Sequence, residues 1–495
     1  MTENYIISFD LHIFWIVFFL TLLLFTAADI VFTHRNETDR TLLWLLLLAA
    51  QPVLGFLIYI LFGRSRNDTV GKKIAFSSIE FRRRIRGRLR KKKYFDAVHK
   101  FLPDYSKYGK SENAFRTLDR LLPETMPLEG NSIQLLQDGT DAYPAMIQAI
   151  RNAEKTIFLQ SFIIANDETG NALFAELRQR ALQGVKVRVL YDSFGSFFSG
   201  FSSFFRQYNK GLENFRIYSF SFSSQLIQWN FQLRNHRKLL IIDSETAFMG
   251  GLNISQKNLI HKSDKFIHDL HCKIEGPAVS ELLLVFLRDW YYVTKGKDSV
   301  FTDFNPVNPK SLGKSEVRIV ASGFGQLQEG SANIFQTAAA TAEDSIWIIS
   351  PYFVPDAPFV KALCMAAARG VDVRVIVPEL NNHFYVKMAS RSLYATLLNG
   401  RVRIFERKNV FVHTKAMIVD RKWAMLGSSN CDIRSFRLNL ELDAVICGEK
   451  ILSELYDMFL RETDSSEEIF LADVERKNPM VRIAENICGL FSPVL

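Results

Sequence analysis

The hydrophobic pattern begins with two long apolar stretches and then changes to short apolar runs between polar segments. Residues 42–62 carry no charge over 21 positions, and a helix of that length, at 1.5 Å per residue, can cross a hydrocarbon core about 30 Å thick. Residues 13–28 are nearly as apolar and continue through Asp29 to Phe32. The pattern therefore predicts a hairpin of two transmembrane helices within residues 1–65.

The rest of the chain repeats one order of elements twice. An apolar strand around residues 157–160 is followed by a helix over 171–182, and a second strand begins after Gly184. The same order recurs as a strand over 346–350, a helix over 357–368 and a strand after Gly370. Strands that alternate with helices predict an α/β fold whose sheet is mixed but largely parallel, with helices covering it.

Each half then carries the same short pattern of imidazole, ammonium and carboxylate groups. The pattern His-x-Lys-x-x-x-x-Asp is followed by a turn of small residues and an asparagine, and its members are His236, Lys238, Asp243 and Asn253 in the first half and His413, Lys415, Asp420 and Asn430 in the second. Side chains alternate along a strand, so the His and Lys of each copy share one face and can point at one phosphate. For a single copy, a core histidine beside a solvated lysine would explain the pattern equally well, but two extended copies make that explanation a poor one.

A carboxylate lies about thirty residues beyond each histidine. The segment that begins at Asp269 aligns with the segment that begins at Glu441, and both end on a glycine. A carboxylate that binds one imidazole nitrogen fixes the tautomer and leaves the other nitrogen ready to react. We expect Asp269 to serve His236 and Glu441 to serve His413.

The two motif aspartates are open to two interpretations. Asp243 and Asp420 belong to the repeated signature, which places them among the candidate catalytic residues. They also stand at the far ends of the predicted strands, where contacts to neighbouring loops are an equally good role.

The charge distribution narrows the class of substrate. Residues 64–93 hold 13 Lys or Arg against two acidic residues, whereas residues 1–63 hold two against five. Of the chain's net charge of +9, residues 94–495 therefore carry only +1. A nuclease would need a basic surface around its site, so nucleic acid is not expected as a partner. The cations beside the apolar hairpin instead predict a cytoplasmic catalytic portion and contact with anionic lipids.

The motif residues are suited to phosphodiester chemistry without a metal ion. Charge spreads over the phosphate oxygens in the transition state, and Lys238 and Lys415, with the amides of Asn253 and Asn430, are the candidate clamp for it. Histidine, with an ordinary pKa near 6.5, can act as nucleophile when neutral and as acid when protonated. The sequence shows no cluster of acidic metal ligands, and its five cysteines lack pair spacing. We predict no metal and no cofactor.

The doubled motif resembles the phospholipase D superfamily, and its surroundings resemble bacterial cardiolipin synthases of that type. The similar segments include Arg234-Asn235 before the first motif, Ser350-Pro-Tyr-Phe-Val-Pro355, and Asp432-Ile-Arg-Ser-Phe-Arg-Leu-Asn439. The resemblance implies two similar lobes related by a pseudo-twofold axis, with both motifs at the seam. It also implies that His236 forms a phosphohistidine while His413 acts as acid and then as base.

In that family two phosphatidylglycerol molecules are joined into cardiolipin, and glycerol is released. The expected domains are a transmembrane hairpin (1–65), a basic juxtamembrane linker (66–128) and two phospholipase D-like lobes (129–310 and 311–495). The expected location is the bacterial cell membrane, crossed more than once, and a homo-oligomer is compatible with the sequence. A phospholipase D that uses water, or a transferase with a different alcohol acceptor, would carry the same residues. A non-catalytic scaffold is disfavoured because no motif position is missing.

One segment departs from the family pattern. Residues 193–222 are rich in Ser and Phe, and six phenylalanines between Phe194 and Phe205 share a helical face. An element that dips into the bilayer beside the site and a helix of the protein core explain this pattern equally well.

Overall fold

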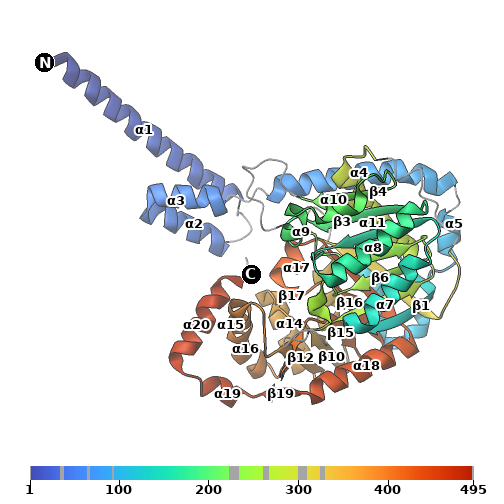
Figure 1. The fold of residues 1–495 in the computed structure, drawn as a ribbon. Helices are drawn as coiled ribbons and strands as arrows, with labels where there is room; N and C mark the ends of the chain where they lie inside the picture. Colours follow the sequence, from blue (N-terminus) through green and yellow to red (C-terminus); the bar gives the residue numbers. More distant parts are fainter. Residues whose placement is uncertain are drawn as a thin grey trace. The chain divides into compact units, whose positions relative to one another are not determined.

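The computed structural model describes residues 2–33, 38–63, 67–91, 94–221, 233–259, 267–298, 309–323 and 329–492. The described residues form two compact units, one within residues 1–72 and one from residue 73 onward. Figure 1 traces the chain through both units.

The first unit contains one helix that can span a membrane. Helix α1 (Thr2–Thr33) includes the segment Phe14–Thr33, which is long and apolar enough to cross, and most of it is exposed. The aspartate that interrupts this segment has a partner, because Tyr59 donates a hydrogen bond of 2.8 Å from its hydroxyl to Asp29 Oδ2. The apolar prediction for residues 13–32 therefore agrees with the structure.

Residues 42–62 do not form the single spanning helix that the sequence predicts. They form α2 (Thr38–Ala50) and α3 (Pro52–Ile58), which continues into a π-helical turn (Tyr59–Gly63). The chain turns at Gln51, and Pro52 occupies the first turn of α3, where its missing N–H costs nothing. A Cβ on Gly55 would lie 2.7 Å from the carbonyl oxygen of Leu47, so α2 and α3 pack closely side by side. The absence of charge hid this break, because length and hydropathy do not report a reversal of direction.

The segment 66–128, which the sequence predicts to be a linker, is largely helical. It contains α4 (Asn67–Lys91), α5 (Tyr94–His99), a 3₁₀ helix (Tyr105–Ser111) and α6 (Glu112–Leu121). Phe81, Ile85 and Leu89 form one buried face of α4, while the arginines between them are exposed. In the second unit this face belongs to the same core as the central strands, so the basic segment is part of the folded catalytic unit.

A sheet of 15 strands forms the centre of the second unit. In sheet order the strands are β19 (Ser466–Ile469), β13 (Arg403–Arg407), β12 (Asp372–Pro378), β10 (Ser345–Ile349), β15 (Ala416–Val419), β16 (Trp423–Gly427), β18 (Glu441–Cys447), β9 (Ser315–Ser322), β1 (Pro127–Gln137), β8 (Leu270–Glu275), β6 (Thr246–Gly250), β5 (Leu239–Ile242), β2 (Thr156–Ser161), β3 (Lys186–Asp192) and β4 (Phe215–Phe220). Outward from the central pair β1 and β9, the two halves of the chain contribute six strands each in the same order, and β19 adds a seventh at the edge of the second half.

The sheet is mixed, but it is not largely parallel. Four of its neighbouring pairs are parallel, namely β2/β3, β3/β4, β10/β12 and β12/β13, and the other ten are antiparallel. The prediction was wrong because the strand-helix-strand order holds only at the start of each half. After each motif the chain reverses at once into a hairpin, β5/β6 and β15/β16, and a hairpin can only be antiparallel.

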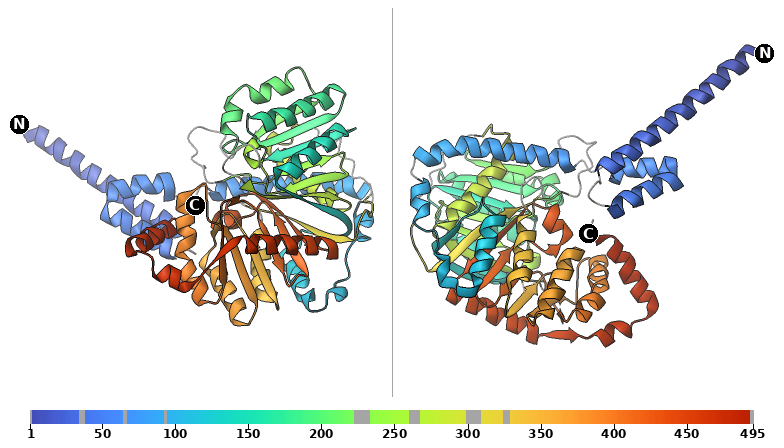
Figure 2. Two further views of the ribbon diagram at one scale, coloured as in Figure 1. Left: turned by 60° about the horizontal axis from the view of Figure 1, so that its bottom comes forward. Right: turned by 180° about the vertical axis from the view of Figure 1, so that it is seen from behind.

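Helices cover both faces of the sheet and bury the motif strands. In the first half, Leu239 and Ile241 of β5 pack towards α11 (Ala278–Thr294), and Leu240 and Ile242 towards α7 (Asp138–Arg151) and α8 (Glu168–Leu182). In the second half, β15 lies between α18 (Glu449–Asp464) on one face and α13 (Gly330–Thr341) and α14 (Ala357–Ala368) on the other. Figure 2 shows α18, in red, running across the strands. The prediction of two buried motif strands is confirmed.

A candidate active site shared by the two motifs

The backbone beside His236 is paired with the second half of the chain. His236 N–H donates to Leu440 O at 2.8 Å, and Leu440 N–H donates to Arg234 O at 2.8 Å. This short parallel bridge places Glu441 next to the imidazole, where Glu441 Oε2 lies 3.1 Å from His236 Nδ1. The carbonyl oxygen of Ser428 also lies 3.1 Å from that nitrogen. Because a carbonyl can only accept, Nδ1 carries the proton and Nε2 keeps its lone pair.

The backbone beside His413 repeats this arrangement with the halves exchanged. Strand β14 (Phe411–Val412) pairs in parallel with β7 (Ile267–His268), and His413 N–H donates to His268 O at 2.6 Å. The next residue of the partner strand is Asp269, whose Oδ2 lies 2.6 Å from His413 Nδ1. Each histidine is therefore held by a carboxylate from the other half of the chain.

This exchange corrects the pairing predicted from the sequence. The sequence predicts Asp269 for His236 and Glu441 for His413, but the structure pairs His236 with Glu441 and His413 with Asp269. The repeat identifies equivalent residues in the two halves, and it carries no information about which half supplies the partner. The parallel bridges between the halves decide the pairing.

The two motif lysines lie in the same buried site. Lys238 Nζ donates to His236 O at 2.7 Å, and Lys415 Nζ contacts both His413 O and His413 Nδ1, the latter at 2.9 Å. Both lysines are 2% exposed, and burial lowers the pKa of Lys415 to about 8 and also lowers that of Lys238. Burial and the charges of both lysines lower the pKa of each histidine, that of His413 to about 4. The charges of the two motif lysines therefore disfavour protonation of both motif histidines.

The two carboxylates differ in their surroundings. Glu441 is fully buried, and its neutral donors are the hydroxyls of Ser428 at 2.5 Å and Ser435 at 2.9 Å and the amide of Asn439 at 3.2 Å. Burial raises the pKa of Glu441 towards neutrality. Burial has the same tendency at Asp269, but Lys415 and His413 outweigh it and hold the pKa of Asp269 below its usual value. The pair at His413 therefore contains a firmly ionised carboxylate, and the pair at His236 does not.

The two motif asparagines differ in their hydrogen bonds. Asn253 Oδ1 accepts a hydrogen bond from Ile163 N–H at 3.2 Å, which ties it to the loop after β2. Asn430 is 4% exposed, and its Oδ1 has no hydrogen-bond partner in the part of the chain that the structure describes. A phosphate oxygen accepts hydrogen bonds, so either asparagine would contact it through the amide Nδ2 and not through these oxygens.

The motif aspartates lie at hairpin turns away from the histidines. Asp243 and Asp420 follow their strands at positive φ, 53° and 51°, and the next residue in each turn also has a positive φ. Two consecutive left-handed residues are the feature of a type I′ turn, a conformation in which Asp is enriched. Seven residues along an extended chain also separate each aspartate from its histidine by roughly 20 Å. Their assignment to the catalytic residues is therefore corrected.

The carboxylates of these aspartates bind the beginning of a neighbouring strand. Asp243 accepts the backbone N–H groups of Glu154, Lys155 and Thr156, each at 2.7 Å. Asp420 accepts those of Glu343, Asp344 and Ser345, the shortest contact to each lying between 2.7 and 3.1 Å. In each half this carboxylate holds the motif hairpin against β2 or β10.

Replacing Asp420 with Ala should lower stability and leave the chemistry of the folded protein intact. Loss of the carboxylate leaves three backbone amides without their acceptor, which should cost about 2–3 kcal/mol of unfolding free energy. Asp420→Asn keeps one acceptor oxygen and should cost less. Chemical unfolding of the purified full chain measures the cost, and turnover per folded molecule is the second readout. Loss of turnover with unchanged stability would return Asp420 to the catalytic residues.

Binding of a phosphodiester should weaken as the pH rises. Lys415, with a pKa lowered to about 8, is charged below that pH and neutral above it, so its attraction for an anion is full on the acid side and lost on the alkaline side. We expect the affinity for dimethyl phosphate, whose charge is constant, to fall by up to about tenfold per pH unit above about pH 8. Competitive inhibition measured across this range tests the expectation, with exposed Lys450→Gln as control. An affinity that stays constant would contradict it.

Sequence reasoning missed an ion pair beneath the site. Arg237, between the two motif residues, is fully buried, and its Nη1 lies 2.7 and 2.6 Å from the carboxylate oxygens of Asp289. Its Nε donates to Glu441 O at 2.9 Å and its Nη2 to Ser322 O at 3.0 Å, both in the second half. The one signal in the sequence is Arg237 itself, a second cation inside the first motif. It does not indicate that the partner is Asp289, 52 residues away.

The Phe-rich segment divides between the two interpretations. Phe204 and Phe205, in α10 (Phe204–Asn209), are buried in the core beneath α8. Phe194 and the phenylalanines of α9 (Phe197–Phe201) are exposed. The core interpretation is therefore confirmed for Phe204 and Phe205, and the bilayer interpretation stays a prediction for the exposed phenylalanines.

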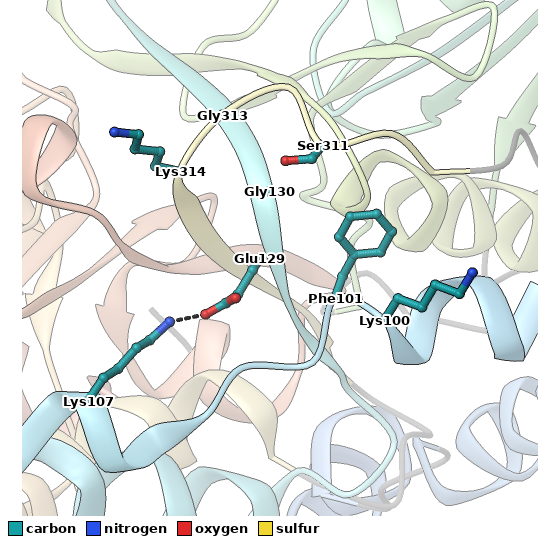
Figure 3. A pocket seen from close by; sticks show the side chains of 8 residues that line it. All are labelled: Lys100, Phe101, Lys107, Glu129, Gly130, Ser311, Gly313 and Lys314. Carbon is teal, nitrogen blue, oxygen red and sulfur yellow. Dashed lines mark hydrogen bonds and ion pairs between the residues drawn. The ribbon is translucent and has the colours of Figure 1, made fainter.

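A separate hollow lies away from the motif residues. It has a volume of about 330 Å³, and Figure 3 shows the Lys107–Glu129 ion pair beside it. Its lining residues are Lys100, Phe101, Lys107, Glu129, Gly130, Ser311, Gly313 and Lys314. No residue of the two motifs lines this hollow.

Comparison with known proteins identifies the family of the chain. The family model described as "Cardiolipin synthase, PLD-like domain" matches residues 146–290 and 336–463, and one described as "Phospholipase_D-nuclease N-terminal" matches residues 13–64. The crystal structure of phosphatidylserine synthase from Haemophilus influenzae covers 78% of this chain and is itself covered completely, with a TM-score of 0.59 at 15% identity, which shows a shared fold.

Curated relatives match along almost the whole chain. A cardiolipin synthase from Alkalihalophilus pseudofirmus is 32% identical, over 97% of this chain and 93% of the relative. One from Listeria welshimeri is also 32% identical, over 97% of this chain and 98% of the relative. The chain belongs to the cardiolipin synthase family of phospholipase D-like proteins.

Proposed function

We propose that the protein is a membrane-bound phosphatidyltransferase that joins two phosphatidylglycerol molecules into cardiolipin and releases glycerol. The observation that carries this proposal is one buried site with two lysines and two histidine-carboxylate pairs, built in the middle of a chain whose relatives are cardiolipin synthases. Such a site suits double displacement at phosphorus, because each histidine has its tautomer fixed by a partner.

We propose that the two halves are phospholipase D-like lobes, residues 129–310 and 311–495, related by a pseudo-twofold axis. The repeated strand order supports this relation, as does the antiparallel pairing of β1 with β9 at the centre. The exchanged histidine-carboxylate pairs are a third support, because a twofold axis turns one pair into the other.

In the first step His236 acts as the nucleophile. Its pKa is lowered by burial and by both lysines, so it is neutral, and its free Nε2 attacks phosphorus. The P–N bond forms as the P–O bond to glycerol breaks. His413 gives a proton to the departing oxygen, and ionised Asp269 stabilises the imidazolium that exists before this transfer. The negative phosphodiester that enters the site favours the protonated form of His413.

The second step reverses the first with a new alcohol. His413 removes the proton from the headgroup hydroxyl of a second phosphatidylglycerol, whose oxygen attacks phosphorus as the P–N bond breaks. Lys238, Lys415 and Asn430 are our candidates for holding the phosphate oxygens through both steps. Asn253, which is bonded to the loop after β2, fits a supporting role. None of these steps requires a metal ion or a cofactor.

We place the protein in the bacterial cell membrane with its catalytic unit on the cytoplasmic side. Helix α1 supports membrane attachment, and the cations of α4 support the orientation. Anionic lipids are the expected partners of the exposed arginines of α4, and nucleic acid is not expected as a partner. Assembly into a homo-oligomer is compatible with this arrangement.

A product assay separates this proposal from its two alternatives. The purified full chain is incubated with phosphatidylglycerol vesicles in the presence of EDTA, and the products are identified by mass spectrometry. Cardiolipin together with glycerol supports the transferase. Phosphatidic acid alone would identify a phospholipase D that uses water, and a phosphatidyl ester formed only with another added alcohol would identify a different acceptor.

A further inference from the structure

We infer that four exposed phenylalanines beside His236 form a membrane-contact surface that enters the acyl region of the bilayer. The members of this surface are Phe194, Phe197, Phe198 and Phe201, which are 57%, 52%, 87% and 85% exposed. The inference rests on the proposed function, because a lipid substrate has to reach a buried site. It adds a second point of membrane contact to helix α1.

The outward direction of these side chains is fixed by the backbone. In α9 the polar Ser199 is 3% exposed while the phenylalanines around it point outward, the reverse of a helix that faces water. Asp192 Oδ1 accepts the N–H groups of Phe194 and Gly195 at 2.9 and 3.0 Å. Ser196 Oγ donates to Phe162 O at 3.0 Å and accepts from Ile164 N–H at 2.9 Å. Because these hydrogen bonds fix the backbone of the loop, the phenylalanine side chains form an apolar patch on the protein surface.

The membrane-contact surface is continuous with the catalytic site. Gly195 packs on Phe162, where a Cβ would lie 2.8 Å from the ring, and the Phe162 ring lies 4.9 Å from the ring of His236. The guanidinium of Arg234 lies 4.2 Å from the ring centroid of Phe194. Because side chains alternate along an extended chain, Arg234 shares a face with His236. From the surface inward, the side chains are first apolar (Phe194), then cationic (Arg234) and then catalytic (His236). This order matches the acyl chains, the phosphate and the scissile bond of a phospholipid.

A second apolar face lies on the same side of the catalytic unit. Helix α20 (Pro479–Leu490) packs against α15 (Phe384–Ser392) through Cys488 and Val386. Its exposed apolar residues recur at helical spacing, and together with the residue after the helix they are Met480, Val481, Ile483, Ile487, Leu490 and Phe491. Figure 1 shows α9, α15 and α20 along one side of this unit. The bilayer is the occupant that fits, because α1 is long and apolar enough to cross a membrane and the proposed substrate is a membrane lipid.

Fluorescence quenching tests the contact without reference to activity. Phe198→Cys, made in a chain in which the partly exposed Cys364 and Cys488 are replaced by Ala, is labelled with an environment-sensitive dye. The full chain is placed in phosphatidylglycerol nanodiscs with or without acyl chains that carry a quencher. We expect at least about twofold quenching at position 198 and none at Lys450→Cys, a site on α18 whose native side chain is 88% exposed. Equal quenching at both sites, or none at either, would overturn the inference.

An activity measurement separates lipid from other occupants. The triple variant Phe197→Ser, Phe198→Ser, Phe201→Ser should lose about tenfold in turnover on vesicles and stay within about twofold on detergent micelles, where lipid need not leave a bilayer. Met365→Ser, on α14 and 56% exposed before substitution, is the matched control. Two results would show that a second copy of the chain covers this surface. One is an equal loss of turnover in micelles, and the other is an oligomer that the wild-type chain forms and the triple variant does not. A wild-type chain that makes no cardiolipin refutes the proposed function and leaves the quenching result standing.

Discussion

Replacing His236 with alanine should lower the rate of cardiolipin formation by a factor of about 10⁴ or more. In the proposed mechanism, the variant lacks the nitrogen that forms the bond to phosphorus. Glu441, its partner, lies behind the imidazole at Nδ1 and is shielded from the substrate by the ring. Initial rates with labelled phosphatidylglycerol measure the loss.

The control for this substitution is another histidine outside the site. His99, at the end of α5, is exposed, and His99→Ala should keep the wild-type rate. His413→Ala should also be severely impaired, because the leaving glycerol then departs without a proton. Full activity of His236→Ala would refute its assignment as the nucleophile.

Replacing Arg237 with alanine should destabilise the catalytic unit by about 3–5 kcal/mol. The substitution removes the close ion pair of Asp289 and leaves this buried carboxylate with a longer contact, 3.9 Å from its Oδ1 to Arg288 Nε. It also removes the donors to Glu441 O and Ser322 O, which tie the first motif to two strands of the second half. Chemical unfolding of the purified full chain, followed by circular dichroism, measures the cost.

The double variant Arg237→Ala, Asp289→Ala provides the control for this prediction. It removes the uncompensated charge together with its partner, so it should be less destabilised than Arg237→Ala alone. Arg288, the neighbour of Asp289 on α11, offers a second comparison, because Arg288→Ala leaves the Arg237–Asp289 pair in place. A cost below about 1 kcal/mol for Arg237→Ala would show that this ion pair does not hold the halves together.

The sequence predicts the parts of the fold that repeat. Two copies of a strand-helix-strand unit, each followed by a buried motif strand, are visible because hydrophobic periodicity and glycine positions are local signals. Helix α14 begins and ends at the predicted residues. Helix α8 begins three residues before the prediction, because Asp167 accepts a hydrogen bond from Gly170 N–H and caps it there.

The sequence does not predict relations between distant segments. The exchange of Asp269 and Glu441 depends on which strands pair across the halves, and equivalent residues look the same in either arrangement. The roles of Asp243 and Asp420 depend on turn geometry that a motif spacing does not reveal. The break at Gln51 and Pro52 lies inside an apolar run, where the proline is the one local signal of a helix boundary.

The most direct test of this account is to identify the covalent intermediate. The full chain is mixed with phosphatidylglycerol and quenched within one turnover under alkaline conditions, which preserve a phosphorus–histidine bond. The protein is then digested and examined by mass spectrometry. We expect a phosphatidyl group on His236 and no such group in the His236→Ala variant. A phosphatidyl group on His413 in the wild-type chain, or cardiolipin formed with no histidine modified, would contradict it.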